Sequence, residues 1–230
     1  MNIKDFFIRL TAFEWVLWLG SAAVITVSYI LAGEYDGLTL IASIIGVTAL
    51  IFTAKGNVLG PVILIFFSLI YGYISFTQQY YGEIFTYVGM SAPVSAVSVV
   101  TWLKNPYSSN EVKVKRLSAE KMIILMIATA VVTVLFYFIL KLCGTASLII
   151  STVSVITSFL ASMLTVLRSP LYAAAYALND IVLIVLWVIA SLGDASCVPM
   201  VVCFAVFLIN DLYGLKNWLK MQKEQEVSAN

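Results

Sequence analysis

The chain has 230 residues, of which 62% are hydrophobic and only 11% are charged, and its mean hydropathy is +1.01. Soluble domains carry about 25% charged residues, so this composition excludes an ordinary soluble protein and indicates one that lies in a lipid bilayer. A net charge of +1 gives no basic surface for a nucleic-acid partner, and the absence of histidine removes most metal sites. We therefore expect the lipid bilayer as the main partner, with no nucleic acid, metal or cofactor.

Eight apolar segments follow one another along the chain, each near the ~20 residues that are needed to cross a bilayer. After a surface lead-in at 1–13, they are predicted at 14–32, 38–54, 58–76, 83–103, 122–142, 146–167, 171–191 and 197–219. The first segment lacks the cleavage site of a signal peptide, so it is expected to stay as a helix. The sequence thus predicts an all-α membrane protein with eight transmembrane helices.

The basic residues favour one orientation of these helices. Twelve Lys and Arg residues fall on one side of the eight-helix arrangement, and only Lys141 falls on the other. Loops rich in Lys and Arg stay in the cytoplasm, so both termini and the polar loop at 104–121 are predicted to be cytoplasmic.

A weak internal repeat divides the chain. Predicted helices two to four end in VVTWLKN and helices six to eight end in GLKNWLKM, and a shift of 113 residues aligns the tight basic joints at Lys55 and Arg168. With helix five between them, both triplets run in the same sense, which is a 3+1+3 parallel repeat with one extra N-terminal helix. The expected units are a lead-in with the extra helix (1–36), the first triplet (37–106), a loop with the linker helix (107–144), the second triplet (145–220) and a cytoplasmic tail (221–230).

Each of the last two predicted helices carries an Asn-Asp pair, Asn179-Asp180 in one and Asn210-Asp211 in the other. A carboxylate near the middle of a bilayer costs at least ~2.5–3.5 kcal/mol, so such residues usually mark a polar pathway or a binding site. The alternatives are structural, because Asn179 could make a helix–helix hydrogen bond worth ~0.6 kcal/mol. Asp211 could likewise pair with Lys216.

Aromatic residues surround the first pair. On a helix of 3.6 residues per turn, one stripe of the seventh helix contains Tyr172, Tyr176, Asn179, Leu183 and Trp187. A row of rings with an amide at its centre suits a flat ligand with polar edges, such as a nucleoside or a vitamin.

Other aromatic residues have simpler explanations. Trp218 is expected in an aromatic belt at the membrane interface, and Tyr213 could act as a gate. Tyr71 and Tyr87, in the outer half of the first triplet, could line an entry, but a belt at the periplasmic side is the more economical assignment.

No enzyme motif accompanies these features. The sequence contains no GxxxxGK[ST] loop, no HExxH and no GxSxG, so no catalytic residue is predicted and ATP-driven transport by this chain alone is disfavoured. Two other classes remain open beside a transporter: a substrate-capture subunit of an ATP-driven importer, and a membrane scaffold with polar residues used only for packing.

Three stretches carry a resemblance to a known family: GNVLGPVILIFFSLIYGYISFTQQYYGEI, RSPLYAAAYALNDIVLIVLW and FLINDLYGLKNWLKM. They resemble the PnuC family of bacterial vitamin transporters. The resemblance implies uptake of nicotinamide riboside, often labelled nicotinamide mononucleotide, by facilitated diffusion. It also implies a fold like that of the SWEET sugar transporters, a homotrimer in the bacterial inner membrane, and a functional link to a cytoplasmic kinase that traps the substrate.

Related carriers leave alternatives for the substrate, namely thiamin, riboflavin, deoxynucleosides or a sugar. The family resemblance leads us to expect Trp-x-x-Trp-x-x-x-Asn in the seventh helix, where this chain has Tyr172, Ala175 and Asn179. Tyr176 could supply the missing ring. The predicted substrate-binding residues are Tyr172, Tyr176, Asn179, Asp180, Trp187, Asn210 and Tyr213.

Overall fold

The computed structural model describes residues 10–33, 37–77, 81–145 and 147–228, and the regular structure in these ranges is helical apart from one isolated β-bridge. Eight segments are long and apolar enough to cross a membrane, as predicted. The elements are α2 (Ala12–Ala32), α3 (Gly37–Ala54), α4 (Leu59–Thr77), α5 (Tyr81–Thr86), η1 (Tyr87–Ser91), α6 (Ala92–Leu103), α7 (Ala119–Leu142), α8 (Leu148–Val166), α9 (Leu171–Gly193), η2 (Ala195–Cys197) and α10 (Val198–Val227).

The first helix begins two residues before its predicted start because Thr11 caps it. The Thr11 hydroxyl accepts a hydrogen bond from the backbone N–H of Glu14 at 3.3 Å, and the Glu14 carboxylate accepts one from the Thr11 N–H at 2.7 Å. This reciprocal pair satisfies two backbone donors that the helix itself leaves open. Most of the lead-in predicted at 1–13 lies outside the described residues.

The fourth predicted helix is not continuous α-helix. It consists of α5, the π-helical turn η1 and α6, and Pro93 lies in the first turn of α6. Because proline has no backbone N–H, the regular ladder loses a bond there, which favours a wider turn just before it. The π turn was not predicted, although Pro93 is its sequence signal.

The last helix is longer than predicted, and it continues through Val227 into the stretch assigned to a tail. Its extension is held by the loop between α6 and α7. The Gln225 side chain accepts a hydrogen bond from the Val114 N–H at 2.8 Å and donates to the Val112 carbonyl at 3.1 Å. These contacts replace water around the last turns and keep them helical.

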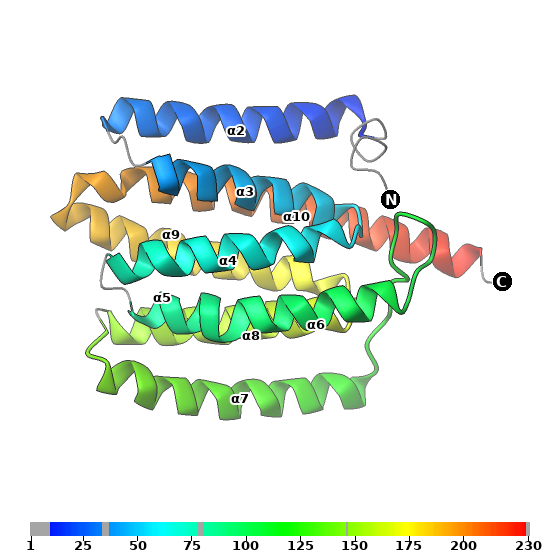
Figure 1. Ribbon diagram of the computed structural model, residues 1–230. Helices are drawn as coiled ribbons and strands as arrows, with labels where there is room; N and C mark the ends of the chain where they lie inside the picture. Colours follow the sequence, from blue (N-terminus) through cyan, green and yellow to red (C-terminus); the bar gives the residue numbers. More distant parts are fainter. Residues whose placement is uncertain (1–9, 34–36, 78–80, 146, 229–230) are drawn as a thin grey trace.

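Two helices lie at the edges of the bundle, and six form its centre (Figure 1). In α2 and α7, only 17% of the spanning residues are buried, compared with 39–56% in the other six spans. The central helices form one group of α3, α4 and α5–α6 and another of α8, α9 and α10. The groups meet where α10 packs on α3 and where α6 packs on α8. This is the arrangement expected of two triplets with one linking and one extra helix; the parallel repeat itself stays a prediction.

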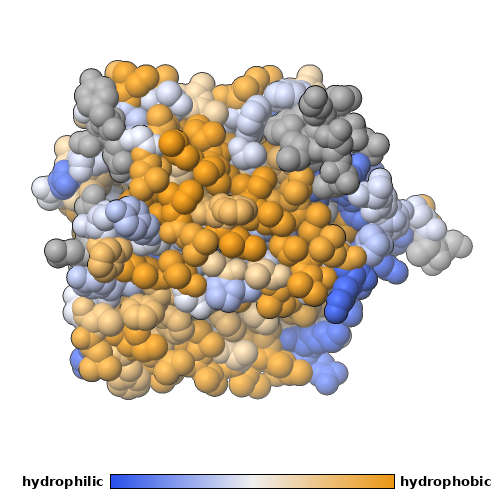
Figure 2. All heavy atoms as spheres, viewed as in Figure 1, coloured by the Kyte–Doolittle hydropathy of each residue, from blue (hydrophilic) through white to orange (hydrophobic). Residues whose placement is uncertain are grey.

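Polar residues gather at the two ends of the bundle around an apolar middle (Figure 2). Helix α2 begins and α10 ends at the same end, which we call the basic end, and the opposite end is called the far end (Figure 1). Among the described basic residues, only Lys141 lies near the far end. The basic end holds Lys55, Lys104, Lys113, Lys115, Arg116, Lys121, Arg168, Lys216, Lys220 and Lys223.

Gly60 allows α3 and α4 to approach closely near the basic end. A Cβ atom at this position would lie 2.6 Å from the backbone nitrogen of Thr53, which is too close for any side chain. Thr53 is itself fixed, since its hydroxyl donates to the Ala49 carbonyl at 2.8 Å. The close contact positions the end of α3, which borders the central cavity described below.

We predict that Gly60→Ala lowers the melting temperature of the purified protein, because overpacking against backbone costs about 1–3 kcal/mol. Gly20→Ala is the matched control, since a Cβ atom on that residue of α2 meets nothing within 4 Å. The control should leave the melting temperature unchanged or raise it slightly. Equal melting temperatures for the two variants would contradict the close contact.

Candidate ligand-binding site

A cavity of about 50 Å³ lies between the two groups of central helices. Small-molecule pockets typically measure ~300–1,000 Å³, so the helix groups must move apart before the cavity admits a ligand of nucleoside size. Most of its wall is aromatic or aliphatic, with a few polar groups on α9 and α10. It is lined by Gly46, Leu50, Thr53, Pro61, Leu64, Phe67, Tyr87, Thr165, Tyr172, Tyr176, Asn179, Asp180, Phe204, Phe207 and Asp211.

Asn179 is held in one orientation by hydroxyl groups of α8. Its side-chain oxygen accepts hydrogen bonds from Thr157 and Ser158, both at 2.8 Å, and from Ser154 at 3.5 Å. Helix packing alone needs one such bond, whereas three saturate the oxygen. The amide N–H₂ group is then the part of Asn179 that is left to donate to a molecule in the cavity.

The carboxyl groups of Asp180 and Asp211 lie within hydrogen-bonding distance of each other, across the contact between α9 and α10. A hydrogen bond between two carboxyl groups needs a proton, so the pair carries at most one negative charge. Oδ2 of Asp180 is buried and has no hydrogen-bond partner in the described part of the chain. A hydrogen-bond acceptor that lacks a partner in a cavity wall is suited to accept a hydrogen bond from a ligand. The alternative pairing of Asp211 with Lys216 is not among the ion pairs of the described residues.

The two predicted tyrosines of α9 form part of the same wall. The Tyr176 hydroxyl lies 3.3 Å from that of Ser162, which fixes its ring. The ring of Tyr172 lies 4.8 Å from that of Trp218 and 6.2 Å from that of Tyr176, at 68° and 77°. Ala175 is buried but is not a lining residue, so the ring beside Asn179 comes from Tyr176.

Trp187 and Asn210 are buried, but they are not among the lining residues. The Trp187 indole N–H donates to the Tyr71 hydroxyl at 3.1 Å. The Asn210 amide donates to the hydroxyl of Ser21 in α2 at 2.9 Å and to the Val206 carbonyl at 2.9 Å. The bonds to Tyr71 and Ser21 join helices, and the role of Trp187 and Asn210 in substrate binding remains a prediction.

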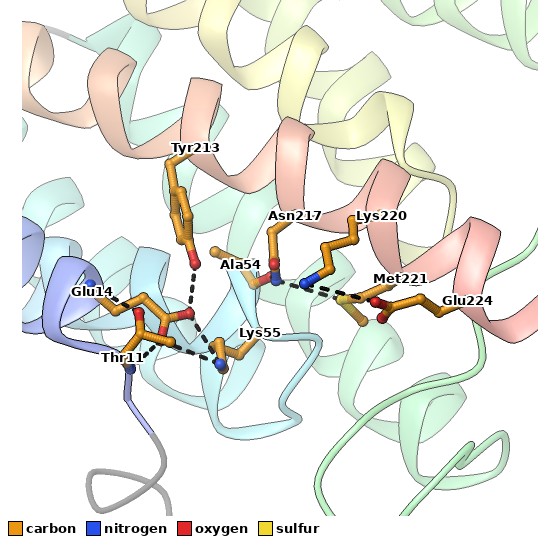
Figure 3. Close-up of polar contacts among 9 residues, drawn as sticks. All are labelled: Thr11, Glu14, Ala54, Lys55, Tyr213, Asn217, Lys220, Met221 and Glu224. Atoms are coloured by element: carbon orange, nitrogen blue, oxygen red, sulfur yellow. Dashed lines mark hydrogen bonds and ion pairs between the residues drawn. The ribbon is translucent and has the colours of Figure 1, made fainter.

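Tyr213 takes part in a polar network at the basic end (Figure 3). Its hydroxyl donates to the carboxylate of Glu14, which also forms an ion pair with Lys55 at 3.0 Å. Nearby, Asn217 donates to the Ala54 carbonyl at 2.7 Å. The network ties the start of α2 to the end of α3 and to α10, away from the cavity lining.

A buried pair of tryptophans near the basic end, Trp102 and Trp218, was not expected from the sequence as part of the site. The exposed fractions of their side chains are 2% and 0%, so Trp218 is not in a lipid-facing belt. Trp102 donates to the Thr165 carbonyl at 3.0 Å, and Trp218 donates to the Thr53 carbonyl at 2.8 Å. Thr53 and Thr165 both line the cavity.

The two bonds cross between the helix groups. Each tryptophan lies in the third helix of one group and bonds the first helix of the other, and the two rings lie 5.4 Å apart. Such an exchange is what a parallel repeat would produce. The sequence signal was the match of Trp102 with Trp218 between the two triplets.

Comparisons with known proteins point to one family. A family model described as nicotinamide mononucleotide transporter matches residues 36–220. A nicotinamide riboside transporter PnuC of Neisseria mucosa is 28% identical, over 96% of this chain and 86% of the relative, and one of Haemophilus influenzae is 24% identical, over 90% of each. Among solved structures, a crystal structure of the vitamin B3 transporter PnuC is 26% identical, with a TM-score of 0.83 and coverage of 94% of each chain.

We predict that the tryptophan pair holds the cavity closed toward the basic end. A single cysteine at Leu50, a lining residue, tests this in a variant that lacks the native cysteines. Trp102→Phe with Trp218→Phe keeps a smaller aromatic ring at each position but removes two cross-group hydrogen bonds of about 0.5–1.5 kcal/mol each. If these bonds form only in the closed state, the open fraction rises ~5- to 150-fold. We expect the cysteine to react faster with a water-soluble maleimide by a similar factor.

Trp15→Phe, on the peripheral helix α2, is the control and should leave the reaction rate unchanged. An unchanged rate in the double variant would show that the tryptophans do not close the cavity.

Proposed function

Because this chain belongs to the nicotinamide mononucleotide transporter family, we propose that it carries nicotinamide riboside across the membrane. It is a multi-pass membrane transporter, with eight helices able to span a bilayer. The relatives from Neisseria mucosa and Haemophilus influenzae are both named riboside transporters. The observation that carries the proposal for this chain is the chemistry of its cavity.

The cavity matches a riboside better than a nucleotide. Nicotinamide riboside has a flat ring with a positive charge, an amide group and ribose hydroxyls, whereas the mononucleotide adds a phosphate. The lining offers aromatic rings for the flat cation and a carboxyl pair, Asp180 and Asp211, for its charge. No Lys or Arg is among the described residues that line it, so a phosphate would lack a counter-charge.

Each polar group has a partner on this ligand. The free amide N–H₂ of Asn179 donates to the carboxamide oxygen or to a ribose oxygen. The unpaired Oδ2 of Asp180 accepts from a hydroxyl or balances the ring charge. Tyr172 and Tyr176, at 77° to each other, cover two sides of the ring.

Transport then requires that the cavity open to each side in turn. In this proposal, the crossed bonds of Trp102 and Trp218 hold the helix groups together at the basic end. Rocking one group against the other breaks these bonds and opens the cavity there. The family resemblance supports facilitated diffusion, in which a cytoplasmic kinase traps the substrate by phosphorylation. The sequence itself has no nucleotide-binding loop with which to drive transport.

We also propose a homotrimer in the bacterial inner membrane, with both termini in the cytoplasm. The family resemblance supports the trimer, and α7 exposes apolar side chains such as Ile123, Ile127 and Val134 for lipid or neighbouring copies. The gathering of basic residues at the end where α10 terminates supports the orientation.

Binding to the purified protein tests the function, with nicotinamide riboside, its mononucleotide, thiamin, riboflavin, deoxynucleosides and sugars compared. We expect the riboside to bind most tightly. Asp180→Asn keeps the shape and the contact with Asp211 but weakens an acceptor, so riboside affinity should fall roughly 10- to 150-fold. Asp194→Asn, an exposed site outside the cavity, is the control. Wild-type affinity in Asp180→Asn would refute the binding role of Asp180, and tighter binding of another compound would refute the substrate.

Thiol labelling in intact cells tests the orientation. Ser109 is exposed in the loop at the basic end, and the native Cys143 is exposed at the far end. We expect an impermeant maleimide to label Cys143 in the wild type but not a cysteine at position 109 in a Cys143→Ser background. The reverse pattern would invert the proposed orientation.

A further inference from the structure

The most anomalous polar group in the described part of the chain is the carboxyl group of Glu83, in the first turn of α5. The side chain is 2% exposed, and neither of its oxygens has a hydrogen-bond partner in that part. Leaving a charged group buried and unpaired costs several kcal/mol, so such a group needs a reason. Glu14, by contrast, is neutralised by Lys55 and bonded by Tyr213.

The surroundings of Glu83 are aromatic. The carboxyl group interacts electrostatically with Tyr71 of α4 and Tyr87 of η1. The centres of these two rings lie 4.4 Å apart at 58°, and the Tyr71 hydroxyl accepts the bond from Trp187. Both tyrosines are buried within the bundle, so they are not part of a lipid-facing belt.

The carboxyl group of Glu83 lies between the far end of the bundle and the cavity. Helix α5 begins at the far end, and Glu83 precedes Tyr87 by one helical turn (Figure 1). Tyr87 itself lines the cavity, so one aromatic side chain connects the two places. Tyr87 also opens the π-helical turn, and such turns often occur at functional sites, where they re-aim side chains.

We propose that Glu83, Tyr71 and Tyr87 form an entry station that receives the positively charged ring of the substrate before it reaches Asp180. The inference rests on the proposed function. A carboxylate near two tyrosine rings can bind an organic cation, since the carboxylate and the aromatic rings all supply negative potential. The arriving cation provides the partner that the carboxyl group lacks. In the structure described here the station is closed, and separation of the helix groups at the far end opens it.

The charge of the ring separates this role from a packing role. Nicotinamide riboside is a cation, and its 1,4-dihydro form has nearly the same shape but no charge. Initial uptake of both compounds at low concentration is measured in proteoliposomes that contain wild-type protein, Glu83→Gln or Asp194→Asn. Asp194 is an exposed carboxylate near the far end, so its variant controls for general attraction of cations.

We expect Glu83→Gln to slow uptake of the cation roughly 10- to 150-fold, the effect of one charge-assisted contact. Uptake of the dihydro form should change less than about twofold, within the scatter of surface substitutions. Asp194→Asn should leave both rates as in the wild type. Equal slowing of both compounds in Glu83→Gln, or no slowing, would overturn the entry station.

A second pair of variants covers the case in which Glu83→Gln does not fold. Glu83→Asp keeps the charge and should preserve the ratio of cation to dihydro uptake, whereas Tyr87→Leu removes an aromatic face and should lower it. An unchanged ratio in Tyr87→Leu would likewise refute the station. If the wild-type protein takes up neither compound, the proposed function itself fails, and the inference falls with it.

Discussion

The contact between the carboxyl groups of Asp180 and Asp211 is the constraint around which the bundle is arranged. Lipid offers no partner for a polar group, so acidic side chains in spanning helices must face one another or a cavity. On the same helix α9, Asn179 meets the hydroxyls of α8, and Tyr172 and Tyr176 face the cavity. The polar wall of the cavity is therefore arranged around this contact between two helices.

The two ends of the cavity are bordered by different chemistry. At the basic end, the hydrogen bonds of Trp102 and Trp218 join the helix groups through backbone carbonyls, which are present whatever the side chain. Toward the far end, Tyr71 and Tyr87 pack beside a carboxyl group without a partner. The indole N–H groups of the tryptophans are both hydrogen-bonded, whereas the Glu83 carboxyl group lacks the partner that we propose a cation supplies. This asymmetry fits a carrier that admits a cation from the far end and releases it at the basic end.

The relatives and the cavity chemistry agree on the riboside, although the matching family model is described by the mononucleotide. The difference between these substrates is one phosphate group. A phosphate in a low-dielectric cavity needs basic partners, and the described lining provides carboxyl groups instead. Cavity charge thus carries more information on the substrate than ring shape does, because most nucleoside-like vitamins have a flat ring.

The sequence by itself determined the eight spans and the position of their polar residues, because the hydropathy of a helix depends only on its own residues. It also indicated the family, through three stretches that resemble its members. It also located the wall residues Asn179, Asp180, Tyr172 and Tyr176, since helical periodicity places them on neighbouring faces. Only the tertiary structure decided what those faces meet. In a membrane bundle both the lipid side and the protein side of a helix are apolar, so periodicity does not distinguish them. For that reason Trp187 bonds Tyr71, Asn210 bonds Ser21 and Tyr213 bonds Glu14, each on a helix that the sequence pattern could not identify as its neighbour.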